Sequence, residues 1–449
     1  MGKFVGTALI MICIITVKNM VFYKVFKVKP EKLILFMEFL WYNYKRGGDC
    51  MILRPDYIEA VKPFMDAPLV KILTGVRRCG KSTIFEMIRQ ELLERGIPED
   101  HIIMKKYTEM DIPDTITAKQ MYDELVSRVE DDKRYYFLLD EIQEIKGWEK
   151  AVNSLLEGMN ADIYVTGSNS KLMSSEISTY LTGRYISIPV FTLSFREYLE
   201  FKKESTQSYD KLLEEYIKFG GFPIIALGEY EQQSAYQIVD GIYHTVVSRD
   251  IVKRHRINKQ DLFDRVVKYV IENMGKTFSA SSISNFLKSE NRKVSIESIY
   301  NYLRWLEQAF IIFPCERYDM QGKSILKTQE KYYLADVSFR YALFGYNRKM
   351  LDGVMENIVY LELCRRGYDV YVGKNNTKEI DFIAIHKDEK IYVQVCVQIP
   401  ENSNREVGNL MEIRDHYPKY VVTLNEMDVG IENGIRIVHL RDFLLAKQW

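Results

Sequence analysis

Cysteine is scarce in this sequence, and no two cysteines have the spacing of a metal-binding or redox motif. The six cysteines are spread over 449 residues without a CxxC pair, at Cys13, Cys50, Cys79, Cys315, Cys364 and Cys396. This pattern excludes a disulfide framework and a zinc finger, and it fits a reducing compartment. We therefore expect a cytoplasmic protein.

An excess of charge of one sign is also missing. Lys plus Arg and Asp plus Glu each number 62, which argues against a strongly basic coat for non-specific nucleic-acid binding. The balance is uneven, because residues 1–50 carry eight basic and three acidic residues and the remaining 399 carry 54 and 59. The six histidines form no metal-like cluster, and no Ser/His/Asp arrangement is visible. A hydrophobic fraction of 47% excludes wholesale disorder.

The apolar run at residues 4–17 is too short to cross a bilayer, which takes about 20 residues. No signal-peptide cleavage site follows it. An uncleaved amphipathic anchor is one interpretation of residues 1–50, so membrane attachment depends on this segment. The other is a misassigned start: Met51 opens a plausible domain, and the codons for Arg46-Gly47-Gly48 resemble a ribosome-binding site.

A phosphate-binding loop follows the first strongly predicted strand, residues 68–74. Residues 75–83 match GxxxxGK[ST], and apolar residues at helical spacing come next. Backbone N–H groups of such a loop cradle phosphates, and the helix N-terminus adds a favourable dipole. Lys81 would neutralise phosphate charge, and the Ser82 hydroxyl would ligate Mg²⁺. The predicted nucleotide-binding residues are Gly75, Val76, Arg77, Arg78, Cys79, Gly80, Lys81, Ser82, Thr83 and, from a later strand, Asn169.

A buried strand that ends in acid supplies the second half of this site. Residues 134–139 are mostly apolar or aromatic, and two carboxylates, Asp140 and Glu141, follow. We expect Asp140 to hold the Mg²⁺ shell and Glu141 to orient and polarise the attacking water.

Two further candidates lie next to later predicted strands. The strand at 161–166 ends in Gly-Ser-Asn-Ser, so Asn169 or Thr166 could sense the γ-phosphate; the alternative is a polar turn. Arg184 precedes a short strand and could act as an arginine finger on the transferring phosphoryl group, or it could form a surface ion pair.

Taken together, these motifs resemble bacterial and archaeal AAA-type ATPases with a C-terminal domain of unknown function. The resemblance rests on residues 75–83, 138–143, 165–170, 181–184 and 219–223, and it covers about residues 51–400. Met51-Ile-Leu-Arg-Pro also looks like the opening of such proteins. The resemblance implies an αβα nucleotide-binding core with a helical lid that contains Gly220 and Gly221.

The region from 261 to 335 predicts three helices followed by a hairpin, which suggests a winged helix–turn–helix. Ser295 is a suitable cap for the third helix. That helix would enter the major groove in a DNA reader, but its charges do not require this, and protein contacts or domain docking remain an equal alternative. Lys323, Lys327 and Lys331 on the hairpin are candidates for phosphate contacts.

Residues 336–449 alternate helix and strand and look like the core of restriction-endonuclease-type nucleases. A glutamate of the predicted helix, Glu356 or Glu362, and Asp381 on a strand would be the acids, but Gln394-Val-Cys396 stands where an E-x-K strand is expected. Without that carboxylate and lysine, metal binding and water activation should be weak. We therefore expect a nuclease fold without nuclease activity.

The sequence thus predicts an α/β protein in five parts: residues 1–50, a P-loop AAA-type αβα core at 51–205, a helical lid at 206–260, a winged helix at 261–335 and a degenerate nuclease-like domain at 336–449. The preferred function is an ATP hydrolase or ATP-driven switch that uses ATP and Mg²⁺ and acts on a protein or DNA partner. A nucleic-acid-binding regulator that uses ATP as an assembly signal is the alternative. Both a homo-oligomer, in which Arg184 would act in trans, and a monomer stay open.

Overall fold

Residues 10–17, 20–27, 52–108, 116–173, 180–257, 259–322, 324–400 and 405–449 are described by the computed structural model. The chain divides into two compact units, Met1–Leu53 and Arg54–Trp449. In the first unit, β1 (Ile10–Val17) and β2 (Met20–Lys27) form an antiparallel hairpin. The interpretations of residues 1–50 as an anchor or a misassigned start otherwise fall outside the described residues.

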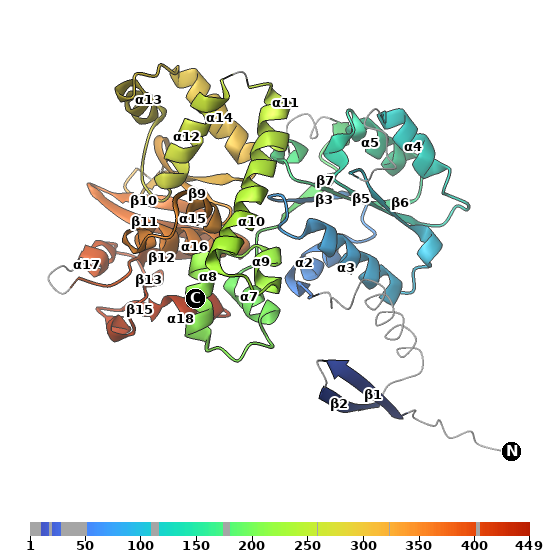
Figure 1. Cartoon of the computed structure of the whole chain (residues 1–449), viewed down its shortest axis with the longest axis horizontal. Coiled ribbons are helices and arrows are strands. Elements are labelled where there is room, and N and C mark those ends of the chain that lie inside the picture. Colours follow the sequence, from blue (N-terminus) through green and yellow to red (C-terminus); the bar gives the residue numbers. More distant parts are fainter. Residues whose placement is uncertain are drawn as a thin grey trace. The chain divides into compact units, whose positions relative to one another are not determined.

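A five-stranded parallel sheet forms the centre of the AAA-like part of the second unit (Figure 1). Its strand order is β4-β5-β6-β3-β7. The strands are β3 (Val70–Thr74), β4 (Ile102–Lys106), β5 (Tyr135–Asp140), β6 (Ala161–Gly167) and β7 (Tyr185–Pro189). Because β3 lies between β6 and β7, the loop that follows β3 emerges from an interior strand of the sheet, next to the edge strand β7.

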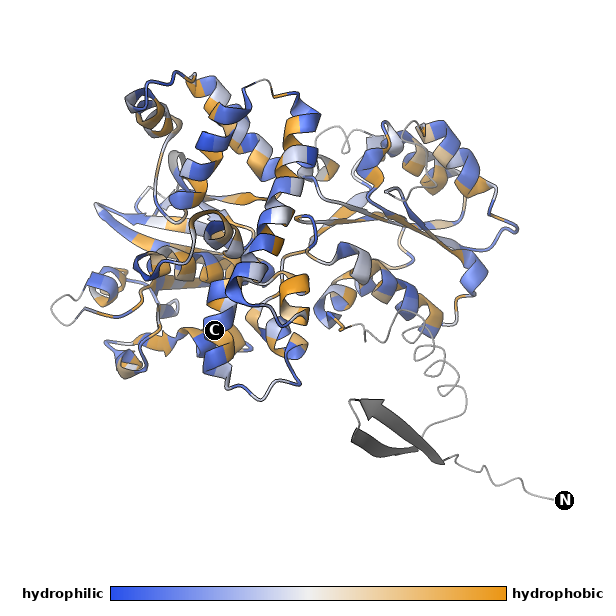
Figure 2. Cartoon of the chain, in the orientation of Figure 1, coloured by the Kyte–Doolittle hydropathy of each residue, from blue (hydrophilic) through white to orange (hydrophobic). Residues whose placement is uncertain are grey.

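Helices cover both faces of this sheet and make it an αβα sandwich (Figure 1). On one face lie α2 (Pro55–Val61) and α3 (Lys81–Glu94), and on the other lie α4 (Ala118–Val126) and α5 (Trp148–Gly158). The core on the α4–α5 face includes Val70, Phe137, Val165, Leu125 and Trp148, all buried. Figure 2 shows the corresponding concentration of apolar residues on the strands. The predicted αβα core is therefore confirmed.

Helices dominate the next part of the chain and end in one long rod. The first three are α7 (Phe195–Phe201), α8 (Tyr209–Phe219) and α9 (Pro223–Leu227). The rod consists of α10 (Gln232–Thr245), a π-helical turn (Val246–Val252) and α11 (Lys253–His255). Three more helices follow, α12 (Gln260–Glu272), α13 (Ala280–Ser289) and α14 (Ile296–Gln308). As expected, the Ser295 side chain caps α14 by accepting a hydrogen bond from the backbone N–H of Ser298.

An eight-stranded mixed sheet forms the C-terminal half, in the order β14-β15-β13-β12-β11-β10-β8-β9. Its strands are β8 (Ile312–Asp319), β9 (Ser324–Leu334), β10 (Asp369–Asn375), β11 (Lys378–His386), β12 (Glu389–Val395), β13 (Lys419–Thr423), β14 (Gly430–Glu432) and β15 (Ile435–His439). The accompanying helices are α15 (Ser338–Phe344), α16 (Leu351–Arg365), α17 (Arg405–Met411) and α18 (Leu440–Leu445).

The hairpin of β8 and β9 differs from the arrangement expected from sequence. The two strands do pair antiparallel, but β8 also pairs parallel with β10, from Val372–Arg317 to Lys374–Asp319. The expected boundary between residues 335 and 336 therefore cuts a region whose strands share one sheet. The winged helix stays a prediction for the three preceding helices.

Among the described residues, no helix combines the length and the apolar character needed to cross a membrane.

Candidate nucleotide site

The loop after β3 has room only for glycine at its first position. A β-carbon on Gly75 would lie 2.1 Å from the backbone oxygen of Val190, well inside van der Waals contact. Gly80, at φ 106°, turns the chain into the first residue of α3, a left-handed conformation that glycine adopts at little cost. The loop geometry thus leaves the open cradle that phosphate binding needs. Of the other predicted loop residues, Val76 and Cys79 are buried, while Arg78 and Thr83 are exposed.

Lys81 lies at the start of α3 and reaches back over this loop. Its Nζ donates hydrogen bonds to the carbonyl oxygens of Gly75 and Val76, at 2.9 and 3.2 Å. The side chain is 4% exposed, so its positive charge is held over the cradle. Placed there, it can meet a phosphate with little rearrangement.

Ser82 and Asp140 meet at the carboxyl edge of the sheet. The Ser82 hydroxyl donates to Asp140 Oδ2 at 2.7 Å. Thr166, at the end of β6, donates to the other oxygen of Asp140 and accepts the backbone N–H of Glu141 at 3.0 Å. Hydroxyl and carboxylate oxygens are the ligands that Mg²⁺ prefers, with the remaining positions filled by water and phosphate. The residues present therefore fit a magnesium nucleotide.

Glu141 occupies a strained backbone position beside this pair. Its φ is 54°, in a region that non-glycine residues populate mostly where the surroundings force them to, often at functional sites. The carboxylate accepts hydrogen bonds from Gln143 and from the Ser168 hydroxyl, the latter at 3.3 Å. Burial alone would raise the pKa of Glu141, but Lys81 and these hydrogen bonds outweigh it and hold the pKa below its usual value. The carboxylate is therefore charged at neutral pH, as a residue that polarises water should be.

Asn169 and Arg184 differ in how they relate to this cluster. Asn169 follows β6 at the same edge of the sheet and is 1% exposed. Arg184 directly precedes β7, and its carbonyl accepts the backbone N–H of Val70 at the start of β3. Its guanidinium donates to Glu157 and Asn153 at 2.5 and 2.9 Å. The structure thus places Arg184 at the opposite edge of the sheet from the loop, in the alternative role of an ion pair within this chain.

Arg54 donates a hydrogen bond to the backbone of the phosphate-binding loop, and it was not predicted as a site residue. Nη1 donates to the carbonyl of Cys79 at 2.8 Å, and Nη2 donates to the carbonyl of Phe191 at 3.0 Å. Nε and Nη2 also bind both carboxylate oxygens of Glu197, at 2.7 and 3.1 Å. The side chain is 2% exposed. The sequence offered only one signal, the Arg54-Pro55 dipeptide within the family-like opening at Met51.

Residues 190–197, which we call the junction segment, join the loop to the C-terminal half. Val190 donates its backbone N–H to the Thr74 carbonyl at 2.6 Å, and Leu193 donates to the Gly221 carbonyl at 2.7 Å. Gly221 in turn donates to Asp336 Oδ2 at 2.8 Å. The segment is therefore bonded at one end to the last residue of β3 and at the other to Gly221 of the predicted lid, which in turn contacts Asp336.

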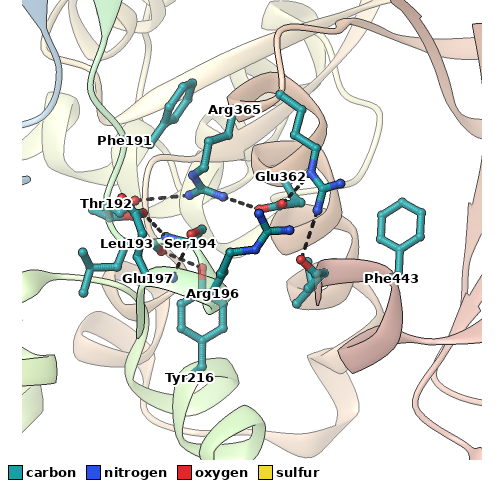
Figure 3. A network of polar contacts seen from close by, with 12 residues as sticks. Phe191, Thr192, Leu193, Ser194, Arg196, Glu197, Tyr216, Glu362, Arg365 and Phe443 are labelled. Carbon is teal, nitrogen blue, oxygen red and sulfur yellow. Dashed lines mark hydrogen bonds and ion pairs between the residues drawn. The ribbon is translucent and has the colours of Figure 1, made fainter. Parts of the chain in front are cut away.

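Arg365 of α16 completes this connection (Figure 3). Its guanidinium donates to the Thr192 carbonyl at 3.2 Å and to Glu362 at 2.8 Å, and it lies 5.5 Å from the ring centroid of Phe191. Thr192 Oγ1 also donates to the carbonyl of Ala335 at 3.1 Å. Contacts between the AAA-like part and the C-terminal half thus include a charge-assisted hydrogen bond from Arg365 and a buried neutral one from Thr192.

The acids expected from the nuclease-like pattern do come together, but around a lysine. Lys331 Nζ lies 3.1 Å from Glu356, 3.0 Å from Glu379 and 3.8 Å from Asp381. Gln394 accepts the backbone N–H of Asp381 at 3.3 Å. Within the described residues, no group of three or more His, Cys, Asp or Glu side chains is arranged to hold a metal ion.

Lys331 therefore requires a correction. It was expected on an exposed wing, where it could contact phosphate, but it is 3% exposed and lies in an ion-pair cluster with three carboxylates. Burial alone would lower its pKa, but the surrounding carboxylates outweigh burial and raise it. Lys323 and the side chain of Lys327 fall outside the described residues.

Comparisons with known proteins find an AAA domain in this chain. A family model described as an AAA domain matches residues 67–199, and a second, described as a domain of unknown function (DUF8612), matches residues 210–350. An uncharacterized protein of Haemophilus influenzae is 38% identical over 400 residues, which are 88% of this chain and 99% of that protein. An uncharacterized protein of Methanocaldococcus jannaschii is 31% identical over 84% of this chain and 85% of its own length.

Among solved structures, the Walker-type ATPase PABY2304 of Pyrococcus abyssi matches with a TM-score of 0.44 and 15% identity. The match covers 64% of this chain and 93% of that one.

Proposed function

This chain belongs to the family that includes the Haemophilus influenzae relative and carries a P-loop AAA-type domain, and we propose that it binds ATP with Mg²⁺ and hydrolyses it. One observation carries this proposal: Lys81 and Ser82 at the start of α3, and Asp140 and Glu141 at the end of β5, meet around one glycine cradle. A glycine-rich turn that matched the motif by chance would not bring the acids to its edge.

Each of these residues has a separate task in the proposed reaction. Lys81, which now donates to two loop carbonyls, would turn its ammonium to the β- and γ-phosphates and neutralise charge there. Ser82 and Asp140 would hold the metal ion, which supplies charge neutralisation when bound. Glu141, kept anionic by Lys81 and its hydrogen bonds, would accept a hydrogen bond from the attacking water and orient it toward the γ-phosphate.

Thr166 and Ser168 position these acids. Thr166 donates to Asp140 and holds the backbone N–H of Glu141, so the two carboxylates keep a fixed mutual orientation. Ser168 restrains the Glu141 side chain from the next turn. A role for Asn169 in sensing the γ-phosphate, and for Arg184 as a finger that acts on a neighbouring subunit, are further parts of this proposal.

In this proposal, hydrolysis drives a movement of the C-terminal half. That movement acts on a partner, which is a protein or DNA. The junction segment supports this coupling, because a shift of the loop at Thr74 or Cys79 is passed through Val190 and Arg54 to bonds with Arg365. ATPase activity that rises with added DNA and falls steeply with salt would favour the nucleic-acid partner.

Two variants test the ATPase proposal. We expect Lys81→Ala to weaken ATP binding at least tenfold, and Glu141→Gln to bind ATP with near wild-type affinity but to hydrolyse it about 100-fold more slowly or worse. Lys119→Ala is the matched control, because Lys119 is exposed on α4, where it pairs with Asp123 and lies 5.4 Å from the ring centroid of Tyr122. Titration with a fluorescent ATP analogue and a phosphate-release assay measure the two quantities. Full binding and turnover by Lys81→Ala would refute the site.

A further inference from the structure

The π-helical turn Val246–Val252 brings two charged side chains to the nucleotide site. It continues α10 into α11, so that the three segments form one rod (Figure 1). Turns of this kind are rare and frequently mark functional sites, because the wide turn redirects side chains that an α-helix would place elsewhere. Arg249 pairs with Glu144, three residues beyond Glu141, at 3.2 Å. Asp250 points to the phosphate-binding loop itself.

Asp250 and Arg77 of that loop are joined by a single contact. Arg77 Nε lies 3.4 Å from Asp250 Oδ2, a long and weak hydrogen bond. Asp250 is 1% exposed. Within the described part of the chain, Asp250 Oδ1 and Arg77 Nη2 are both buried without a hydrogen-bond partner. Leaving such groups unpaired is costly, so a buried pair in this state calls for a functional explanation.

The charges of Arg77, Asp250 and Glu141 act on one another. Burial raises the pKa of Asp250, Arg77 and Arg254 lower it, and the negative charge of Glu141 raises it further. Arg77 is also among the charges that lower the pKa of Glu141. Arg77 thus contacts the carboxylate of the rod directly, and its charge also acts on the carboxylate that is proposed to orient the attacking water.

We propose that Asp250 senses the terminal phosphate of a nucleoside triphosphate, because it competes with that phosphate for the guanidinium of Arg77. The inference rests on the proposed function of the loop. A terminal phosphate offers oxygens that suit the planar fork of arginine, and a charge-assisted bond to phosphate is stronger than the long contact with Asp250. A diphosphate lacks that group and leaves the Arg77–Asp250 pair in place.

Release of Asp250 would loosen the rod from the nucleotide site. The rod and the loop belong to different family matches, since Asp250 lies within residues 210–350 and Arg77 within 67–199. The ion pair thus joins the AAA domain to the domain of unknown function at the point where the presence of a third phosphate can be detected. Asp250 is a positioning residue in this scheme, since it acts through Arg77.

Asp250→Asn keeps the shape of the side chain and removes its charge. We expect this variant to bind a non-hydrolysable ATP analogue about tenfold more tightly than the wild type, because the competitor for Arg77 is weakened, and to bind ADP within twofold of the wild type. Hydrogen exchange of residues 246–257 should rise on addition of the analogue, but not of ADP, in the wild type. In Asp250→Asn it should be high from the start and insensitive to nucleotide.

Two further variants keep the test interpretable. Asp240→Asn also removes a carboxylate from the rod, but Asp240 is exposed and pairs with His244, so both affinities and the exchange response should match the wild type. Arg77→Gln should abolish the preference for the triphosphate over ADP, and it provides an independent route if Asp250→Asn folds poorly.

Unchanged affinity for the analogue in Asp250→Asn, or an exchange response like that of the wild type, would overturn this inference and leave the ATPase proposal intact. A wild-type protein that binds no nucleotide, with Lys81→Ala behaving identically, would overturn both.

Discussion

Arg54 offers the sharpest test of how the phosphate-binding loop is held in place. Its guanidinium makes a two-point ion pair with Glu197 and donates to the carbonyls of Cys79 and Phe191, and its side chain is 2% exposed. The Glu197 side chain is only 11% exposed. Burial works to raise the pKa of Glu197, but Arg54 outweighs burial and keeps the pKa below its usual value. The pair is therefore ionised on both sides.

Arg54→Met preserves most of the packing and leaves Glu197 as a buried, unpaired charge. Removal of one partner of a buried pair costs about 3–5 kcal/mol. The carbonyls of Cys79 and Phe191 also lose a hydrogen-bond donor. We therefore expect the free energy of unfolding to fall by an amount near the upper end of that range. The double variant Arg54→Met/Glu197→Gln removes the stranded charge. Its amide oxygen can still accept the Ser194 N–H that Glu197 accepts at 2.8 Å, and we expect the loss to fall to about 1–2 kcal/mol.

Urea unfolding followed by circular dichroism measures these free energies, and titration with a fluorescent ATP analogue measures the state of the loop. Because the Cys79 carbonyl loses its donor in both variants, nucleotide affinity should fall in both, while stability recovers in the double variant. A loss below 1 kcal/mol in Arg54→Met, or a double variant no more stable than the single one, would refute the reasoning.

Two other predictions concern stability away from the nucleotide site. Burial and the nearby Glu330 raise the pKa of Glu307 to about 7. Between about pH 4.5 and 7, the folded chain therefore holds a proton that the unfolded chain releases. The free energy of unfolding thus falls as the pH rises through this window. Glu307→Gln should remove this fall and gain up to about 3 kcal/mol at pH 8; equal pH dependence in both proteins, measured by urea unfolding, would contradict this. A β-carbon on Gly220, whose φ is 74°, would lie 1.8 Å from Asp336 Oδ1. Gly220→Ala should therefore lower the free energy of unfolding by several kcal/mol, which is among the largest effects of single substitutions. Gly241→Ala, in α10 with open space around it, should gain up to about 1 kcal/mol and lower neither the thermal midpoint nor the folded yield.

The nucleotide site could be predicted from the sequence because its signals are local. The glycines of the loop, the strand before it and the helix after it lie within about 25 residues, and the acids directly follow a continuous apolar strand. The edge of the sheet at which Arg184 lies could also have been predicted from the sequence. A residue that precedes a parallel strand must lie at the amino edge, opposite the loop, and the short strand after Arg184 was part of the prediction.

The contacts that sequence reasoning missed join distant segments. Arg54 meets Glu197 across 143 positions, and Arg77 meets Asp250 across 173. No spacing rule links such pairs, because their proximity follows from the packing of whole elements. The pairing of β8 with β10 was missed for the same reason: a hairpin is a local pattern, but its neighbour in a sheet is not.

Among the described residues, the junction segment and the rod both connect the AAA-like part to the rest of the chain, and they differ in strength. The junction segment is held by bonds of 2.6–3.2 Å to Thr74, Gly221 and Arg365. The rod is held by the 3.4 Å contact of Asp250 with Arg77, which leaves a buried donor and a buried acceptor open, and by the partly exposed ion pair of Arg249 with Glu144 at 3.2 Å, a kind of pair that contributes little. Because the weaker contact yields first when phosphate charge arrives at the loop, we expect the junction segment to act as the pivot and the rod as the part that moves. Hydrogen exchange should therefore show nucleotide-dependent change at residues 246–257 and little change at residues 190–197, and the reverse pattern would make the junction segment the moving element.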